Sequence, residues 1–223
     1  MNLVLLDLDN TLLSGDTDVE WLDFLVEQGV LPASEREANH EMDRRYASGE
    51  ASTLEYVRFY LGYYRDFDMA RLLGWRKIFL ENRIRPLMLP AARSLIQDHK
   101  SSLTAIITAT NRFLVEPIAA DFGVEHVMAT EPEIRDGRFT GDIVGPPCMR
   151  EGKIVWLEKW LKARNASLAD FPQTWFYSDS INDLPLLERV SHPVAVDADR
   201  ELADIAAARG WPRISLRNPG APG

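Results

Sequence analysis

The sequence has little of what several classes of protein require. Its 223 residues include one cysteine, Cys148, so an internal disulfide is excluded. Lysine and arginine form no block and the formal net charge at pH 7 is −9, which argues against a nucleic-acid partner. No apolar run approaches the ~18 residues of a membrane span, and the N-terminus has no basic region followed by a small-residue cleavage site. We therefore expect a cytoplasmic protein with neither a nucleic acid nor a membrane as partner.

What the sequence does contain is enough apolar material for a packed core. Hydrophobic residues make up 46% of it, and the length fits either one domain with an insertion or two small domains. Because the chain is acidic overall, an anionic ligand would need a local cation to hold it. The single thiol has no histidine near it in the sequence, so we expect a packed or partly exposed thiol rather than a nucleophile. The pattern does not indicate an oligomeric state.

The stretch from Leu3 to Thr11 combines an apolar run with two acids. Leu3–Leu6 is typical of a strand buried on both faces of a parallel sheet. Asp7 and Asp9 follow it two positions apart, so along an extended chain their side chains point to the same side. The carboxyl ends of such strands are where α/β sheets bind ligands, and two like charges there need a cation or a shared proton. The alternative is a solvated, aspartate-rich turn.

Residues 16–85 have helical patterns throughout and form the expected insertion. The expected helices are one with an apolar side over 19–26 that stops at Gly29, a polar one over 32–48, one capped by Thr53, and one over about 69–84. Pro86 and Pro90 then mark the end of the insertion.

Beyond Pro90 strands and helices alternate. Strands are expected over residues 103–108, 125–129, 174–179, 194–196 and 214–216, and helices over 92–99, 113–122, 153–164 and 201–209. Residues 135–138 have the composition of a hairpin turn, and the tail 218–223, rich in proline and glycine, is expected to be loose. The alternation predicts an α/β fold with a parallel, Rossmann-like sheet and helices on both faces. We place the core domain at 1–15 and 86–223 and a helical cap domain at 16–85.

Three of the predicted strands end in groups that can do chemistry. The first ends at Asp7 and Asp9, another at Thr108, and a later one at Asp179, with Asp183 just beyond it. Carboxylates from two strand ends can form an oxygen-rich site, which suits Mg²⁺ because that ion takes one or two carboxylates and keeps waters and phosphate oxygens. Each group also has an ordinary interpretation, the threonine as a β-former and the later acids as turn or first-turn helix residues.

Two further residues stand at predicted helix starts. Asn182 can cap a short helix that begins at Asp183. Lys153 follows Gly152 and opens a helix, where the helix dipole disfavours a cation. A nearby anion or carboxylate would explain this lysine, and so would simple solvation.

Together these residues could transfer a phosphoryl group. Asp7 could attack phosphorus and form an aspartyl phosphate. Asp9 could protonate the leaving alcohol and then deprotonate the attacking water. Mg²⁺ and Lys153 would offset the charge on the phosphoryl group, and Thr108 would donate a hydrogen bond to it.

With these residues the whole chain resembles the haloacid dehalogenase superfamily. The stretch Asp7-Leu8-Asp9-Asn10-Thr11 is similar to the first motif of that family, DxDxT, Thr108 to the second, Lys153 to the third, and Asp179-Ser180-Ile181-Asn182-Asp183 to the fourth, DxxxD, in the form of the phosphoserine phosphatase branch. The insertion resembles the helical C1 cap of the family. The resemblance implies Mg²⁺ bound by the Asp7 carboxylate, the Asp9 backbone carbonyl and Asp179, with Asp183 supporting.

The resemblance also implies a set of residues that contact the substrate, with departures from the family's pattern. The set is Asp16, Thr108, Ala109, Lys153 and Asn182. In the phosphoserine phosphatase branch an acidic residue nine positions after the nucleophile contacts the substrate's amine, and here that position is Asp16, shorter than the usual glutamate.

Two further departures put phosphoserine itself in doubt. Ala109-Thr110 replaces the usual Gly-Gly, and no arginine stands out as a carboxylate ligand among the candidates Arg44, Arg45 and Arg58. We expect a hydrolase for a small, amine-bearing phosphometabolite, similar to phosphoserine or to histidinol phosphate, whose product alcohol carries an amine and no carboxylate.

Other functions stay open at this stage. A dehalogenase needs the nucleophilic aspartate without the second carboxylate, so Asp9 argues against it. A phospho-acceptor receiver domain is much shorter, usually has its first acids adjacent, and has no helical insertion. A phosphotransferase and a non-catalytic ligand-binding protein on the same scaffold remain as alternatives. Aromatic residues of the insertion could line a specificity pocket or pack its core: Trp21, Tyr46, Tyr56, Phe59, Tyr60, Tyr63 and Tyr64.

Overall fold

A six-stranded parallel sheet organises the computed structural model, which describes residues 1–220. The strands are β1 (Leu3–Leu6), β2 (Leu103–Asn111), β3 (His126–Thr130), β6 (Thr174–Ser178), β7 (His192–Val196) and β8 (Arg213–Ile214). Their order is β3-β2-β1-β6-β7-β8, and every neighbouring pair is parallel. The first strand thus lies in the middle of the sheet, with Leu6 opposite Ile106 on one side and Tyr177 on the other. The predicted Rossmann-like α/β class is confirmed.

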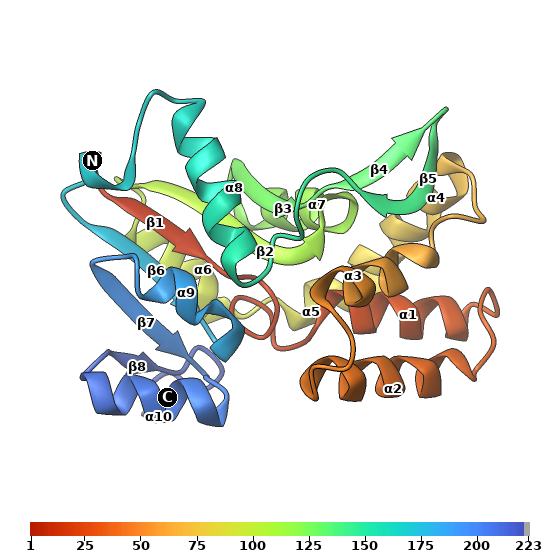
Figure 1. Ribbon diagram of the computed structural model, residues 1–223, viewed down its shortest axis with the longest axis horizontal. Helices are drawn as coiled ribbons and strands as arrows, with labels where there is room; N and C mark the ends of the chain where they lie inside the picture. The colour runs from red at the N-terminus through yellow and green to blue at the C-terminus, as the bar shows by residue number, and fades with distance from the viewer. Residues whose placement is uncertain (221–223) are drawn as a thin grey trace.

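Alternation along the strands separates two apolar cores. Val4 and Leu6 face one side of the sheet and Leu3 and Leu5 the other, and all four side chains are fully buried. Helices α6 (Pro90–Asp98) and α7 (Arg112–Phe122) cover the first side, and α8 (Glu151–Lys162), α9 (Leu184–Leu187) and α10 (Arg200–Arg209) cover the second (Figure 1). The short 3₁₀ turns are η2 (Leu168–Asp170) and η3 (Ile181–Asp183).

Helices follow the first strand, as expected, and lie beside the carboxyl end of the sheet (Figure 1). They are α1 (Thr17–Glu27), α2 (Glu35–Ala47), α3 (Thr53–Gly62) and α4 (Met69–Phe79), which continues through the π-helical turn η1 (Leu80–Ile84) into α5 (Arg85–Leu87). Trp21 anchors this region, because its ring stacks on Tyr64 and meets the edge of Phe79 at ring-centroid distances of 5.7 and 5.0 Å. The proposed limits of a cap domain at 16 and 85 stay a prediction.

Some expected helix boundaries were wrong. Ser52, not Thr53, caps α3, because its hydroxyl and Glu55 form a reciprocal capping box. Pro86 lies inside the short helix α5, which continues from η1, rather than in a break. Pro90 is the first residue of α6, two residues before the expected start, because the first turn of a helix tolerates proline.

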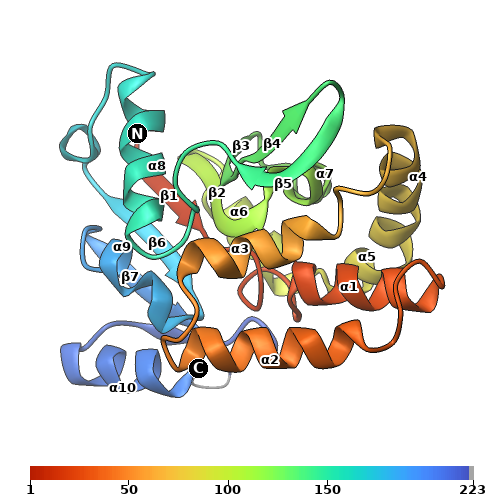
Figure 2. The ribbon, with the colours of Figure 1, turned by 45° about the vertical axis from the view of Figure 1, so that its right-hand side comes forward.

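An antiparallel hairpin reaches from the sheet to the helical insertion. It consists of β4 (Pro132–Arg135) and β5 (Arg138–Ile143), joined by Asp136 and Gly137, which both have positive φ angles (50° and 75°) as such a turn requires. The predicted turn is therefore confirmed. Strand β5 lies against α3 (Figure 2), where Arg58 and Asp142 form a two-bond ion pair.

Three expectations concern the tail, the helices and the single thiol. Within the tail, residues 218–220 are exposed and form a bend and a turn, and the other tail residues, 221–223, lie outside the described part of the chain. Among the helices of residues 1–220, none has the length and apolarity needed to cross a membrane. Cys148 is fully buried, and burial raises the pKa of its thiol to about 12, as expected of a packed residue rather than a nucleophile.

Candidate active site

A cavity of about 210 Å³ lies at the carboxyl ends of β1, β2 and β6. All nine residues predicted for the site line it: Asp7, Asp9, Asp16, Thr108, Ala109, Lys153, Asp179, Asn182 and Asp183. The parallel register explains why they meet, because Leu6 at the end of β1 lies level with Ile106 in β2 and Tyr177 in β6. The residues that follow these three positions therefore open into one space at the edge of the sheet.

Lys153 forms a buried bridge between two carboxylates. Its Nζ donates to Asp7 Oδ1 at 2.7 Å and to Asp183 Oδ2 at 2.6 Å. The lysine is 2% exposed, so its interpretation as a solvated residue is wrong. Burial by itself would lower the lysine pKa, but the carboxylates of Asp183 and Asp7 raise it above its usual value. The ammonium group is therefore a fixed positive charge beside Asp7.

The chain just before Lys153 makes a close approach that requires glycine. A Cβ atom on Gly152 would lie 1.9 Å from the carbonyl oxygen of Pro147. Arg150 precedes it with a φ angle of 51°, in the left-handed region. This tight turn begins α8 at Glu151 and places Lys153 in its first turn, above the strand ends.

Asp7, which the sequence predicts to be the nucleophile, is a mostly buried acid beside a positive charge. It follows β1 directly, its backbone N–H donates to the Tyr177 carbonyl at 3.0 Å, and its side chain is mostly buried. Burial raises its pKa to about 7, although Lys153 acts in the opposite direction, and the neighbouring carboxylate of Asp183 raises it further. A carboxylate of this kind is costly without a compensating positive charge.

Asp9 is held by threonines from two other segments. Thr17 donates to Oδ1 from its backbone N–H at 2.8 Å and also from its hydroxyl. Thr110 donates to Oδ2 at 2.6 Å, and Thr108 lies 3.4 Å from the same oxygen. Burial raises the pKa of Asp9 to about 6, with a contribution from Asp16, while the threonine hydrogen bonds lower it.

Thr11 connects the first carboxylate to the last one. Its buried hydroxyl lies 3.2 Å from Asp7 Oδ2 and 3.1 Å from Asp179 Oδ1, and it accepts the Asp179 backbone N–H at 3.0 Å. Burial and then the charges of Asp7 and Asp183 raise the Asp179 pKa to about 8. Sequence reasoning assigned no task to Thr11, Thr17 or Thr110, and only Thr11 had a signal, as part of the first motif.

The oxygen atoms at this end of the sheet suit a hard cation that takes only a few of its ligands from the protein. Asp183 Oδ2 already accepts from Lys153 and from the Ser178 hydroxyl at 2.6 Å. Within residues 1–220, no three His, Cys, Asp or Glu side chains converge closely enough to hold a metal alone. Asp7 and Asp179 supply two acid groups, which matches Mg²⁺ because that ion completes its shell with water, carbonyl and phosphate oxygens.

The expected cap on the short helix that follows β6 was wrong. Ser180, not Asn182, accepts the hydrogen bond at this turn, from the Asn182 backbone N–H at 3.2 Å. The short helix α9 then follows Asp183, whose side chain makes no capping bond because it bonds Lys153. Asn182 still lines the cavity.

The helical insertion forms part of the wall of the cavity, beside the strand ends. Asp16 caps α1, and its Oδ1 accepts the backbone N–H groups of Asp18 and Val19 at 2.9 and 3.1 Å. Of the seven aromatic candidates, Tyr46 and Tyr56 line the cavity, whereas Trp21, Tyr60 and Tyr64 are buried, with 4% or less of each exposed.

None of the arginines considered for carboxylate binding faces the cavity. Arg44 pairs with Glu41, Arg45 lies near Glu55, and Arg58 pairs with Asp142. Among the residues that line the cavity, Lys153 is the one lysine or arginine.

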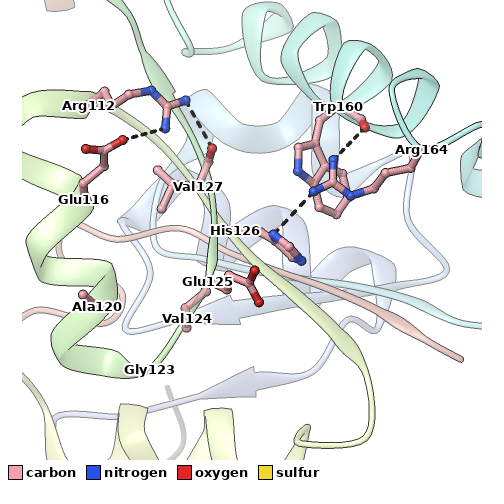
Figure 3. A pocket seen from close by; sticks show the side chains of 10 residues that line it. All are labelled: Arg112, Glu116, Ala120, Gly123, Val124, Glu125, His126, Val127, Trp160 and Arg164. Carbon is pink, nitrogen blue, oxygen red and sulfur yellow. Dashed lines mark hydrogen bonds and ion pairs between the residues drawn. The ribbon is translucent and has the colours of Figure 1, made fainter.

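A larger hollow, of about 530 Å³, lies elsewhere, along α7, β3 and the end of α8 (Figure 3). Arg112 on its wall bonds Glu116 and the Val127 carbonyl, and Arg164 lies over the Trp160 ring. None of the predicted site residues lines this hollow, so the candidate site is the smaller cavity.

The comparisons with known proteins agree with this geometry. The family model of haloacid dehalogenase-like hydrolase matches residues 4–188. A histidinol-phosphatase of Neisseria meningitidis serogroup C (strain 8013) is 38% identical over 97% of this chain and 99% of its own. A crystal structure of a protein of unknown function from Bordetella pertussis Tohama I is 43% identical, with a TM-score of 0.91 over 94% of this chain and 96% of its own.

A phosphoserine phosphatase structure with an analogue of the phospho-aspartyl intermediate matches 91% of this chain and 90% of its own, with a TM-score of 0.67. Because its sequence is 22% identical, it supports the fold alone. The resemblance predicted from the motifs, and the phosphatase class that it implies, are confirmed. The chain belongs to the haloacid dehalogenase-like hydrolase family.

Proposed function

We propose that this protein is a Mg²⁺-dependent phosphomonoester hydrolase that acts on a small, amine-bearing phosphometabolite through an aspartyl phosphate on Asp7. The observation that carries the proposal is the pairing of two differently held acids in one cavity. Asp7 is bonded to the ammonium group of Lys153, whereas Asp9 is bonded to threonine hydroxyls. The ammonium group of Lys153 favours the carboxylate form that Asp7 needs for attack, and burial raises the pKa of Asp9 to about 6, toward the range that suits proton transfer near neutral pH.

The metal is assigned to the oxygen atoms around Asp7. Asp7 and Asp179 would hold Mg²⁺ with their carboxylates and Asp9 with its backbone carbonyl, while Asp183 would support them through Lys153. When bound, Mg²⁺ would offset negative charge on the phosphate oxygens. The shared Thr11 hydroxyl fits this assignment, because it keeps the Asp7 and Asp179 carboxylates on the same side of the cavity.

The reaction follows in two balanced steps. A carboxylate oxygen of Asp7 attacks phosphorus, the bond to the ester oxygen breaks, and Asp9 gives its proton to the departing alkoxide. Asp9 then takes a proton from water, whose oxygen attacks the phosphorus of the aspartyl phosphate. The bond between phosphorus and Asp7 breaks, inorganic phosphate leaves, and both acids return to their starting states.

The remaining groups of the site would position Asp9 and stabilise the charge on the phosphoryl group. Lys153 places its charge beside the oxygen of Asp7 that faces it, and it remains protonated throughout because two carboxylates hold it. Thr108 would donate to a phosphoryl oxygen. Thr17 and Thr110 bond both oxygens of Asp9, so the proton-transferring group has one orientation.

The amine on the substrate is proposed from two facts. The Neisseria meningitidis relative is named a histidinol-phosphatase, and Asp16 faces the cavity from the insertion. An acceptor alcohol in place of water would make the same site a phosphotransferase. The cytoplasmic location expected from the sequence stays a prediction.

The experiment is a phosphate-release assay on histidinol phosphate, phosphoserine, a sugar phosphate and an aryl phosphate, with Mg²⁺ and with chelator. We expect release from at least one metabolite that stops with chelator and in Asp7→Asn. The matched control is Asp204→Asn, a change at an exposed acid of α10. Release that persists in Asp7→Asn would contradict the mechanism, and release that needs an added alcohol acceptor would favour the phosphotransferase.

A further inference from the structure

A small recess adjoins the active-site cavity at the strand ends, on the side of the helical insertion. It shares Asp18, Tyr56 and Ala109 with that cavity and is closed by Val57, Tyr60, Leu61 and Asn111. Its volume is about 20 Å³. A space of this size holds one group about as large as a water molecule, such as an ammonium group, and is too small for a carboxylate or a ring.

The polar atoms around the recess are arranged to accept hydrogen bonds. Tyr56 and Tyr60 lie with their hydroxyls 3.1 and 3.5 Å from Asp43 Oδ1, to which they donate. The two hydroxyl oxygens also lie 3.5 Å from each other, and when both hydroxyls donate to Asp43 each oxygen keeps a lone pair that can accept from a ligand.

Asp18 is the acid of this recess. Its carboxylate receives one long hydrogen bond from the described residues, from Asn111 Nδ2 at 3.3 Å, and that amide also bonds Tyr64. Burial raises the pKa of Asp18 well above its usual value, and the charges of Asp16 and Asp9 raise it further. A cation in the recess would offset the unfavourable free energy of a buried, negatively charged Asp18.

The cavity has no cation to spare for a carboxylate on the substrate. Lys153 is bonded to Asp7 and Asp183. The arginine beside the entrance, Arg150, donates to the Tyr46 hydroxyl at 2.7 Å and lies over that ring. A substrate carboxylate next to the amine would therefore meet acids and phenols.

We propose that Asp18, Tyr56 and Tyr60 bind the ammonium group of the substrate in this recess, so that the enzyme prefers amine-bearing phosphomonoesters without a carboxylate. The inference rests on the proposed hydrolase function and deepens it. It assigns the main contact with the amine to Asp18 rather than to Asp16, because Asp16 Oδ1 already accepts two backbone N–H groups as the helix cap, whereas Asp18 receives one long hydrogen bond from the described residues and lines the recess. It also excludes phosphoserine as a preferred substrate.

The test uses esters that differ by a single group. Phosphoethanolamine carries the ammonium group, n-propyl phosphate replaces it with a methyl group, phosphoserine adds a carboxylate, and p-nitrophenyl phosphate reports the chemistry alone. We expect wild type to have a higher kcat/KM for phosphoethanolamine than for n-propyl phosphate or phosphoserine. Asp18→Asn should lower the ratio of kcat/KM for phosphoethanolamine to kcat/KM for n-propyl phosphate by about 10- to 100-fold, as expected when a hydrogen bond to a charged group is lost.

Controls separate recognition from folding and from the proposed function. Tyr56→Phe, which keeps the ring, should lower the same ratio less, and Asp204→Asn should leave it unchanged. An unchanged ratio in Asp18→Asn, equal turnover of phosphoserine and phosphoethanolamine, or a loss confined to Asp16→Asn would overturn the inference alone. A selective loss of phosphoserine turnover in Arg150→Met would overturn it as well. Release from histidinol phosphate together with no release from the four esters would overturn the inference alone, and no release from any of these five esters would overturn the proposed function together with it.

Discussion

Lys153 Nζ lies 2.7 Å from Asp7 Oδ1, although 146 positions separate the two residues in the sequence. The contact joins the first turn of α8 to the residue that follows β1, and a second contact at 2.6 Å joins the same nitrogen to Asp183. The lysine thereby balances two buried carboxylates that would otherwise repel each other. Stability and chemistry depend on the same three side chains.

Replacing Lys153 by methionine should destabilise the fold and stop turnover. The change keeps much of the side-chain volume but leaves Asp7 and Asp183 buried without their cation, which costs about 3–5 kcal/mol when one partner of such a pair is removed. Urea unfolding and phosphate release would measure the two effects. Lys162→Met, at an exposed position near the end of the same helix, is the control. A Lys153→Met protein as stable as wild type would contradict the assigned role.

Thr110→Val should slow the chemical step more than it weakens substrate binding. The hydroxyl of Thr110 donates to Asp9 Oδ2 at 2.6 Å, so valine removes a bond that orients the proposed proton donor. We expect kcat to fall by about 10-fold, the usual scale for a hydrogen bond to a charged group, with a smaller change in KM. Thr110→Ser keeps the hydroxyl and should recover most of kcat. A rise in KM alone would assign Thr110 to binding instead.

His99 should contribute stability that is lost as the pH falls below neutral, opposite in sign to the contribution of Asp7 and Asp179, whose raised pKa values let the folded state bind protons first. Its Nε2 lies 2.8 Å from the Tyr177 hydroxyl and its ring lies against Trp175, and burial lowers its pKa below the usual 6.5. At His99 the unfolded state binds the proton first, so the contribution of His99 to the free energy of unfolding is largest above pH ~6.5 and falls as the pH decreases toward the folded pKa. Urea unfolding at pH 7.5 and 5.5 should show that acidification changes the free energy of unfolding more favourably in His99→Gln than in wild type. His40→Gln, at an exposed position, should behave as wild type.

Much of the site was predictable because its residues follow strands. The apolar run before Asp7 and the run before Asp179 each indicated a strand, and parallel strands bring their carboxyl ends to one edge. Lys153 needed more than its own pattern, since a lysine in the first turn of a helix is usually solvated. The acids predicted at the other strand ends suggested its assignment and the family resemblance supported it, and the structure shows that it is buried beside Asp7.

The residues that the sequence did not indicate act through tertiary contacts. Thr17 and Thr110 approach Asp9 from a helix start and from the end of β2, and no spacing relates the three. The sequence indicated no role for Asp18, because its position in the recess depends on how α1 and α3 meet. The cap on α3 was misplaced by one residue because Ser52 and Thr53 are equally good capping types, and only the capping box with Glu55 distinguishes them.

Gly152→Ala should impair both the fold and the activity through one backbone contact. Its Cβ would lie 1.9 Å from the carbonyl oxygen of Pro147, a distance that neither group can accommodate without moving the turn that begins α8. Because Lys153 is the next residue, the displacement would separate its Nζ from Asp7 and Asp183. We expect a lower midpoint in urea unfolding and a loss of kcat larger than the change in KM.

Gly74→Ala is the control for that experiment, since this glycine lies inside α4 and a Cβ there would meet nothing within 4 Å. Alanine at that position should raise stability by about 0.5–1 kcal/mol, because alanine loses less backbone entropy on folding than glycine does. The two alanine variants therefore move stability in opposite directions. If Gly152→Ala were as stable and active as wild type, the turn before α8 would be adaptable, and the placement of Lys153 would depend on its ion pairs rather than on the backbone.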